Sequence, residues 1–227
     1  MTSASSVLQA LETRPPNLGE TAYERIVDMM LAGDLPAGTV LQERKLAEIL
    51  DISRTPVREA LMRLDAEGLV RRDQGRTVMV RQIYESEMME ILQVRSTLEA
   101  EAVVLAVKNI SDREIEDLEI AVSQLAAKDS ASVEEHGSVD DRLHGMIAEA
   151  SGNRTLAGII RDLRRKTRFF NTERLPGRFQ PGNSEHLAIL DALRARDADA
   201  ARQAVIDHIG NARQGIINKL QDYGNNS

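Results

Sequence analysis

The sequence contains no cysteine among its 227 residues, which excludes disulfide bonds, thiolate zinc sites, iron–sulfur clusters and cysteine nucleophiles. Tryptophan is also absent, and aromatic residues make up only 3% of the chain, too few for the stacking platforms that usually bind single-stranded nucleic acid. No apolar run approaches the roughly 18 residues of a membrane span, and residues 1–16 lack a basic stretch followed by an apolar one. We therefore expect a cytoplasmic protein with no membrane segment.

Apolar residues make up 42% of the chain, and 36 acidic against 29 basic side chains give a net charge of −7. This apolar content is enough for a packed interior. The acidic balance argues against a general nucleic-acid coat but allows one basic domain beside an acidic one. From the change of pattern along the chain we predict a flexible arm at 1–17, a first domain at 18–82 and an all-helical second domain at 83–227.

Three helices followed by a hairpin are predicted within residues 18–82. The helices begin near Thr21, Glu43 and Arg54, and two β-rich stretches at 69–72 and 77–81 flank turn residues. Ser53 is a suitable N-cap for the third helix, whose first turn tolerates a proline. This order of elements predicts a winged helix-turn-helix.

Several arginines of this domain are placed where one DNA duplex could contact them. Arg44 lies at the start of the second helix, Arg54 and Arg58 lie one turn apart on the third, and Arg76 lies at the hairpin tip. Arginine bound to guanine is the commonest specific contact in the major groove, and Thr55 beside the free N–H groups of the helix start suits a phosphate. The alternative is a solvated basic face, with Arg58 paired to an acid on its own helix; the cap, tight turn and hairpin favour DNA.

The run from Leu46 to Leu61 (LAEILDISRTPVREAL), with Arg63-Leu64 and Glu67 to Val70 after it, resembles the winged-helix signature of GntR-type transcription regulators. The resemblance covers about residues 18–82. Asp51 stands where the family often has Gly, and Asp tolerates left-handed backbone geometry better than most residues. The resemblance implies a DNA-binding set in which Arg44, Arg54 and Arg58 read bases: Arg44, Ser53, Arg54, Thr55, Arg58, Gln74, Gly75 and Arg76.

Beyond residue 85 the periodicity predicts an all-helical bundle of about six helices, larger than the first domain. Ser111 to Glu114 forms a capping box before one of them. The other helical segments lie near 86–108, 134–150, 154–173, 183–195 and 198–220.

Three of the four histidines lie on separate predicted helices of this bundle, each within an apolar stripe: His144, His186 and His208. Asp140 lies one turn before His144 on the same helix face. Three inward histidines and a carboxylate suit a divalent ion such as Zn, Ni or Mn, with positions left open for water or a ligand. The alternative for any single histidine is a hydrogen-bonded core residue, and His136 is most simply a surface residue.

The same region resembles the FCD effector domain of the FadR subfamily of GntR regulators. The motifs that carry the resemblance are Asp140 to His144 (DDRLH), Ala150 to Asn153 (ASGN) and Glu185 to Leu193 (EHLAILDAL), which leads to His208. Leu143 stands where many relatives have Phe. The resemblance favours Asp140 over its rival Asp141 as a metal ligand, and it implies a small carboxylate effector held at the metal.

Effector-binding candidates follow from the same resemblance. Arg95 occupies the place where relatives put an Arg that faces the cavity, and a bidentate Arg suits a carboxylate. An intrahelical pair with Glu99 is an equally good interpretation of Arg95. Asn153 and Arg164 complete the predicted set, although Arg164 and Arg168, one turn apart, are weaker candidates because their whole segment is basic.

We therefore predict a transcription regulator that is not an enzyme. A homodimer would bind a near-palindromic double-stranded operator, and a carboxylate metabolite would change the arrangement of the two DNA-binding heads. Most relatives are repressors, although nothing in these residues shows whether this regulator represses or activates transcription. A metal-dependent hydrolase could use the same His/Asp set, but the chain has none of the usual hydrolase motifs; a helical adaptor with core histidines is a third alternative.

Overall fold

The computed structural model describes residues 17–73, 77–128, 131–171 and 179–225. The chain divides into two compact units with a boundary between Gln82 and Ile83, and each unit is described by itself. The predicted arm at 1–17 lies outside the described residues except for Asn17. The predicted wing residues Gln74, Gly75 and Arg76 also lie outside them.

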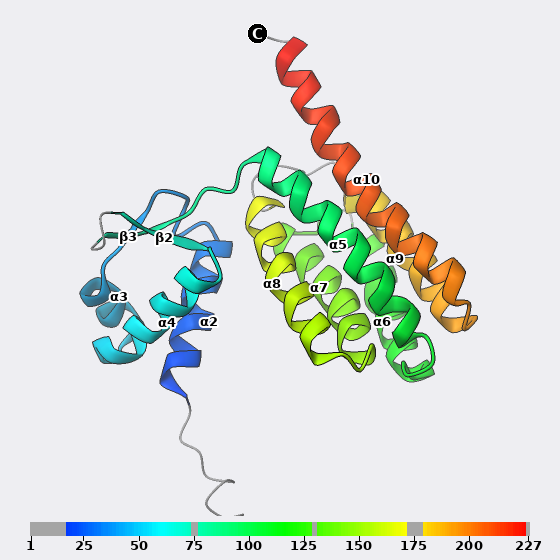
Figure 1. Cartoon of the computed structure of the whole chain (residues 1–227), viewed down its shortest axis with the longest axis horizontal. Coiled ribbons are helices and arrows are strands. Elements are labelled where there is room, and N and C mark those ends of the chain that lie inside the picture. The colour runs from blue at the N-terminus through cyan, green and yellow to red at the C-terminus, as the bar shows by residue number, and fades with distance from the viewer. Residues whose placement is uncertain (1–16, 74–76, 129–130, 172–178, 226–227) are drawn as a thin grey trace, which may run out of the picture. The chain divides into compact units, whose positions relative to one another are not determined.

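The first unit contains three helices and a small antiparallel sheet, which lies beside the helices in Figure 1. Its strands follow the order β1-β3-β2, with Leu41 opposite Val78 and Val70 opposite Val80. Val78 and Val80 alternate with more exposed neighbours, so one face of β3 reaches the core. The bounds of the elements are α2 (Leu18–Leu31), β1 (Val40–Leu41), α3 (Glu43–Leu50), α4 (Arg54–Ala66), β2 (Val70–Asp73) and β3 (Thr77–Val80).

The helix-turn-helix forms where the sequence predicts it. Helix α3 ends at Asp51, whose φ of 54° and ψ of 48° place it in the left-handed region, so this position requires the tolerance that Asp provides. Helix α4 begins at Arg54 as predicted, but the side chain of Ser53 makes no capping hydrogen bond. Ser53 therefore occupies the predicted N-cap position, but its side chain does not form the hydrogen bond expected of an N-cap. The two-residue strand β1 was not predicted, because two residues carry no periodicity.

The second unit consists of helices in its described part, and α5 packs against α7, α8 and α10. One hydrophobic core joins these helices, with Met88, Leu143, Ile160 and Leu190 among the side chains that are almost completely buried. The fold prediction is confirmed: a winged helix-turn-helix precedes a helical bundle. The helix bounds are α5 (Glu85–Ala106), α6 (Asp112–Ala126), α7 (Val133–Ala150), α8 (Arg154–Asn171), α9 (Phe179–Arg194) and α10 (Ala198–Asn225).

Side-chain caps set where several of these helices begin. Ser111 and Glu114 form the predicted capping box at α6, and Ser132 forms a second box with Glu135 at α7. Asp197 accepts hydrogen bonds from two backbone N–H groups in the first turn of α10. These bonds satisfy donors that a helix start otherwise leaves unpaired, so local sequence determines the ends of the helices that position the candidate site.

Candidate DNA-binding surface and metal centre

Three of the predicted DNA-contacting residues, Arg44, Ser53 and Arg54, line one surface hollow at α3 and α4. A hollow of about 620 Å³ is lined by Arg44, Asp51, Ser53 and Arg54, among others. Thr55 is exposed in the first turn of α4. Because Ser53 makes no capping bond, the first N–H groups of α4 remain available to a phosphate.

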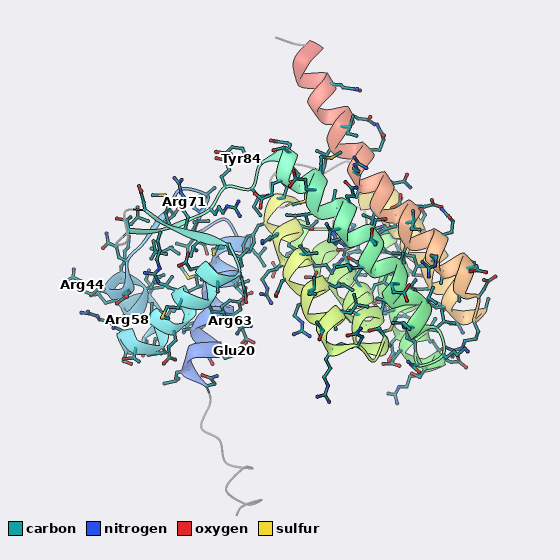
Figure 2. All side chains as sticks on the ribbon, in the orientation of Figure 1. Glu20, Arg44, Arg58, Arg63, Arg71 and Tyr84 are labelled. Carbon is teal, nitrogen blue, oxygen red and sulfur yellow. The ribbon has the colours of Figure 1, made fainter. Side chains whose placement is uncertain are left out.

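Arg44, Arg54 and Arg58 differ in the hydrogen bonds and ion pairs that they make with the rest of the protein. Arg58 donates two hydrogen bonds to Glu43 of α3, at 3.0 and 2.8 Å, and this contact lowers the pKa of Glu43. Arg44 makes only a loose contact with Glu48, at 3.6 Å. Arg54 is exposed and has no ion pair among the residues that the structure describes. In Figure 2 the side chains of Arg44 and Arg58 project outward from α3 and α4.

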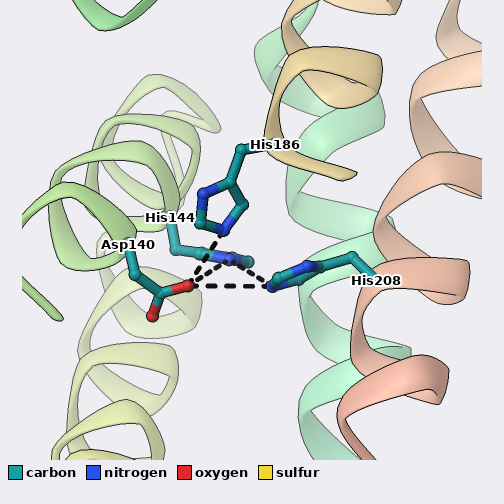
Figure 3. Close-up of side chains that lie close together, drawn as sticks. All are labelled: Asp140, His144, His186 and His208. Carbon is teal, nitrogen blue, oxygen red and sulfur yellow. Dashed lines mark hydrogen bonds and ion pairs between the residues drawn. The ribbon is translucent and has the colours of Figure 1, made fainter. Parts of the chain in front are cut away.

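Four side chains from three helices converge in the second unit: Asp140 and His144 of α7, His186 of α9 and His208 of α10. Each offers one ligand atom, and these four atoms all lie within 4.8 Å of one another. Figure 3 shows the three rings and the carboxylate turned toward a common centre. The Oδ1 atom of Asp140 lies 3.0 Å from Nε2 of His186, 3.6 Å from Nε2 of His144 and 3.7 Å from Nε2 of His208.

Two further carboxylates orient two of these rings. Glu99 contacts Nδ1 of His144, and Glu185 contacts Nδ1 of His208 at 2.9 Å. A carboxylate at Nδ1 keeps the proton on that nitrogen, so in the neutral ring Nε2 carries the lone pair. The Nε2 atoms of His144 and His208 lie only 3.2 Å apart. Two lone pairs and a carboxylate oxygen therefore face one another across a gap that favours a cation.

Asp140 is held in its charged form. Burial by itself raises the pKa of this carboxyl, but Arg164 and the neighbouring histidines hold the pKa well below its usual range. Nη2 of Arg164 donates to Oδ2 of Asp140 at 2.6 Å, which leaves Oδ1 facing the imidazoles. Burial lowers the pKa of His186, which favours the neutral ring that a metal ligand requires.

The structure separates Asp140 from its predicted rival. Asp141 is not among the four converging ligands and instead accepts hydrogen bonds from Arg164 at 2.8 Å and Arg168 at 2.7 Å. His136 lies on α7, one turn before Asp140, and its side chain is partly buried. The prediction of a surface position for His136 is therefore only partly right.

The effector candidates take different places. Arg95 is buried, as a cavity-facing residue would be, yet it also pairs with Glu99 at 2.7 Å and donates to Thr167 at 3.1 Å. Asn153 is exposed, and its side-chain oxygen caps α8 by accepting from the backbone N–H of Leu156. Arg164 alone of the three contacts a residue of the four-ligand cluster.

Sequence reasoning missed the roles of Glu99 and Glu185. Glu99 is 2% exposed and bridges Arg95 and His144, a position that only the packing of α5 against α7 creates. Glu185 precedes His186 in the sequence but serves His208 on the next helix. The i, i+4 spacing of Arg95 and Glu99 was the signal for Glu99, and Glu185 had only its place at the start of the motif EHLAILDAL.

Comparisons with known proteins agree with both units. The profile of bacterial regulatory proteins of the gntR family matches residues 18–80, and the FCD domain profile matches residues 90–211. The chain belongs to the GntR family of regulators with an FCD domain. Members similar to it include the Nta operon transcriptional regulator of Aminobacter aminovorans, 28% identical over 76% of this chain and 81% of that protein. The Uxu operon transcriptional regulator of Escherichia coli is 29% identical over 80% of this chain and 79% of that protein.

Solved structures show the same architecture. Escherichia coli McbR/YncC aligns with a TM-score of 0.77 at 25% identity, over 91% of this chain and 98% of that chain. A metal-free FCD domain of another regulator aligns with a TM-score of 0.54 at 21% identity, over 63% of this chain and 99% of that chain, and shows the fold alone.

Membership of the GntR family makes this protein a DNA-binding transcriptional regulator and not an enzyme. The hydrolase alternative is not supported, because the relatives are regulators and the first unit is a DNA-binding domain. No helix in the described part of the regulator is long and apolar enough to cross a membrane.

Proposed function

We propose that a divalent ion bound by Asp140, His144, His186 and His208, together with a small carboxylate effector beside it, controls the binding of this regulator to its operator. The observation that carries the proposal is the convergence of four ligand atoms from three helices. Ligand atoms about 2.1 Å from one ion, at angles of about 90 to 110°, lie about 3.0 to 3.4 Å apart. The separations of 3.0 to 3.7 Å around Asp140 Oδ1 are close to that range.

The donor set limits the choice of metal. Three imidazole nitrogens and one carboxylate oxygen suit Zn, Ni or Mn and leave coordination positions open. Sites that rely on thiolates are excluded by the absence of cysteine. A bound ion would supply Lewis acidity toward a carboxylate oxygen, and the protein's own residues hold and orient the ring nitrogens around it.

The charges around the cluster favour an anionic effector. Three positive and four negative side chains belong to the cluster or to the ion pairs beside it, so their sum is −1 before an ion binds and +1 with a divalent ion: Arg95, Arg164 and Arg168 against Glu99, Asp140, Asp141 and Glu185. An excess of one positive charge at this partly buried cluster attracts a small anion, because less water screens it than at an open surface. Arg164 is the residue we assign to that anion, and Arg95 holds Glu99 in place.

We further propose that the regulator is a cytoplasmic homodimer that represses transcription until the effector binds. Helix-turn-helix dimers bind two half-sites one or more helical turns apart, so a change in the arrangement of two heads changes operator affinity. The effector controls this equilibrium only if it binds one arrangement more tightly than the other.

The metal part of the proposal is tested by calorimetric titration of chelator-treated full-length protein with Zn²⁺, Ni²⁺ and Mn²⁺. We expect one high-affinity site per chain and its loss in His208→Ala. His136→Ala is the matched control, because this histidine of α7 is not one of the four ligands. Equal metal affinity in His208→Ala and the original protein would refute the site.

The regulatory part is tested with sheared genomic DNA from the source organism. Fragments retained by the protein at near-physiological salt should share a short inverted repeat. Six carboxylates (acetate, pyruvate, lactate, malonate, succinate and citrate) are then added to the metal-loaded protein on that fragment. We expect at least one to lower operator affinity; if all six leave affinity unchanged, carboxylate control is wrong.

A further inference from the structure

Three buried side-chain nitrogens in the described part of the chain have no hydrogen-bond partner: Nη1 of Arg164, Nδ2 of Asn183 and Nδ1 of His186. Arg164 and His186 both contact Asp140. Asn183 lies on α9 one turn before His186, so the two side chains share a face of that helix. The three residues are 5%, 3% and 5% exposed. Each unsatisfied nitrogen therefore belongs to a residue that contacts Asp140 or lies one helical turn from one that does.

All three atoms are donors when an ion is bound. The guanidinium of Arg164 and the amide nitrogen of Asn183 can only donate, and the ring of His186 carries its proton on Nδ1 once Nε2 faces the cation. A buried donor without an acceptor costs free energy, and native proteins retain few of them. A concentration of donors at the metal cluster therefore calls for a ligand rich in acceptor oxygens.

The register of α9 gives Asn183 its direction. His186, Leu190 and Leu193 lie on the buried face of the helix, and Asn183 continues this face by one turn toward the helix start. It therefore faces the bundle interior next to His186, but the four-ligand cluster does not include it. An uncharged amide in this position can donate to an oxygen without adding to the charge that Arg164 already supplies.

We propose that Asn183 is a further effector-binding residue, whose amide nitrogen donates to one oxygen of the carboxylate ligand while Arg164 binds another. This inference rests on the proposed carboxylate control. It adds that the ligand presents two acceptor oxygens to α8 and α9, and that Asn183 contributes to ligand affinity without contributing to metal affinity.

The test uses Asn183→Leu, which keeps a similar side-chain size and removes the donor. The full-length protein is loaded with Zn²⁺, and calorimetry measures its affinity for the same six carboxylates, from acetate to citrate. We expect affinity for the tightest of the six to fall about 10- to 100-fold, the usual effect of losing a hydrogen bond to a charged group. Affinity for Zn²⁺ should change less than about threefold, because Asn183 lies outside the ligand set.

A second measurement separates binding from a structural role. Replacing an unpaired buried donor by an apolar group of similar shape is neutral or stabilising, so the melting temperature of ligand-free Asn183→Leu should stay the same or rise. Asn109→Leu is the matched control, because the amide of Asn109 already donates to the carbonyls of Leu105 and Ala150. That variant should melt lower and bind the carboxylates normally.

The outcomes distinguish this inference from the proposed function. If Asn183→Leu binds the carboxylate as tightly as the original protein, Asn183 is not an effector residue, and the proposed function stands. A lower melting temperature with unchanged affinity would make Asn183 a structural amide and would also overturn the inference. If the original protein binds none of the six carboxylates, the proposed carboxylate control fails, and this inference fails with it.

Discussion

Glu99 shows how much one buried side chain contributes to the candidate site. It is 2% exposed and contacts the guanidinium of Arg95 and the ring of His144. Burial by itself raises the pKa of Glu99, but Arg95 and His144 lower it well below its usual range. The charge of Glu99 is therefore part of the folded structure.

Glu99→Gln should destabilise the metal-free protein by about 3 kcal/mol, because it leaves the charge of Arg95 buried without a partner. Urea unfolding at pH 7 measures the difference. Glu101→Gln is the matched control on the same helix: Glu101 pairs with Arg202 at 3.2 Å on the surface, and its loss should cost less than about 1 kcal/mol. Equal losses in the two variants would contradict a special role for Glu99.

The stabilisation by Glu99 should depend on pH. Its pKa is lowered on folding from a reference value of 4.5, so the unfolded chain takes up a proton before the folded one does. The contribution is complete above the unfolded pKa and is lost as the pH falls through the folded pKa. Unfolding at pH 6, 5, 4 and 3 should show the difference between the metal-free protein and Glu99→Gln shrinking with acid. A constant difference would exclude this linkage.

Arg54 is the predicted DNA-contacting arginine with the fewest contacts to the rest of the described protein. Since it has no ion pair within the described residues, Arg54→Ala should leave stability within about 0.5 kcal/mol and weaken operator binding by about 1 to 3 kcal/mol. Fluorescence anisotropy with an operator fragment at constant salt measures this. Arg113→Ala, at an 88% exposed position of α6, is the control. Unchanged operator affinity in Arg54→Ala would sink the recognition-helix assignment.

The turn between α3 and α4 joins the two helices that carry the candidate DNA-binding surface. Asp51 closes α3 in left-handed geometry, and the backbone N–H of Ile52 then bonds back to Ala47 at 3.1 Å. Glycine takes this geometry without strain and a β-branched residue does not. The departure from the Gly common in the family is therefore compatible with the turn.

Asp51→Val should destabilise the winged-helix unit by about 1 to 2 kcal/mol, whereas Asp51→Gly should change stability by less than about 1 kcal/mol. Thermal unfolding measures both. Asp28→Val places the same substitution at an exposed position within α2, where only helix propensity of a few tenths of a kcal/mol is at stake. If Asp51→Val and Asp28→Val cost the same, the left-handed residue does not limit the turn.

The whole molecule combines two units that should respond differently to metal. The four ligand atoms come from residues 140 to 208 of the second unit, and an ion that binds only the folded state stabilises it by about 2.7 kcal/mol at 100 times its Kd. Chelation should therefore increase hydrogen exchange in α7, α9 and α10 and leave α2 to α4 unchanged. Peptide-resolved exchange with and without chelator measures this, and His208→Ala should show no response. A uniform response of both units would contradict the assignment.

Local sequence determined most of the fold because its signals act over a few residues. The capping box at Ser111, the left-handed tolerance of Asp51 and the apolar stripes around His186 and His208 predicted helix positions that the structure confirms. The strand β1 was not predicted, because a two-residue strand exists only through its pairing with β3.

Convergence was decided by tertiary packing alone. Spacing predicted that three histidines face inward, but only the packing of α7, α9 and α10 brings their Nε2 atoms and Asp140 together. The same packing also brings Asp141 into contact with Arg168, Glu99 with His144 and Glu185 with His208. Side-chain types and helical periods are properties of neighbouring residues, whereas a site spread over residues 99 to 208 depends on contacts that no local pattern records.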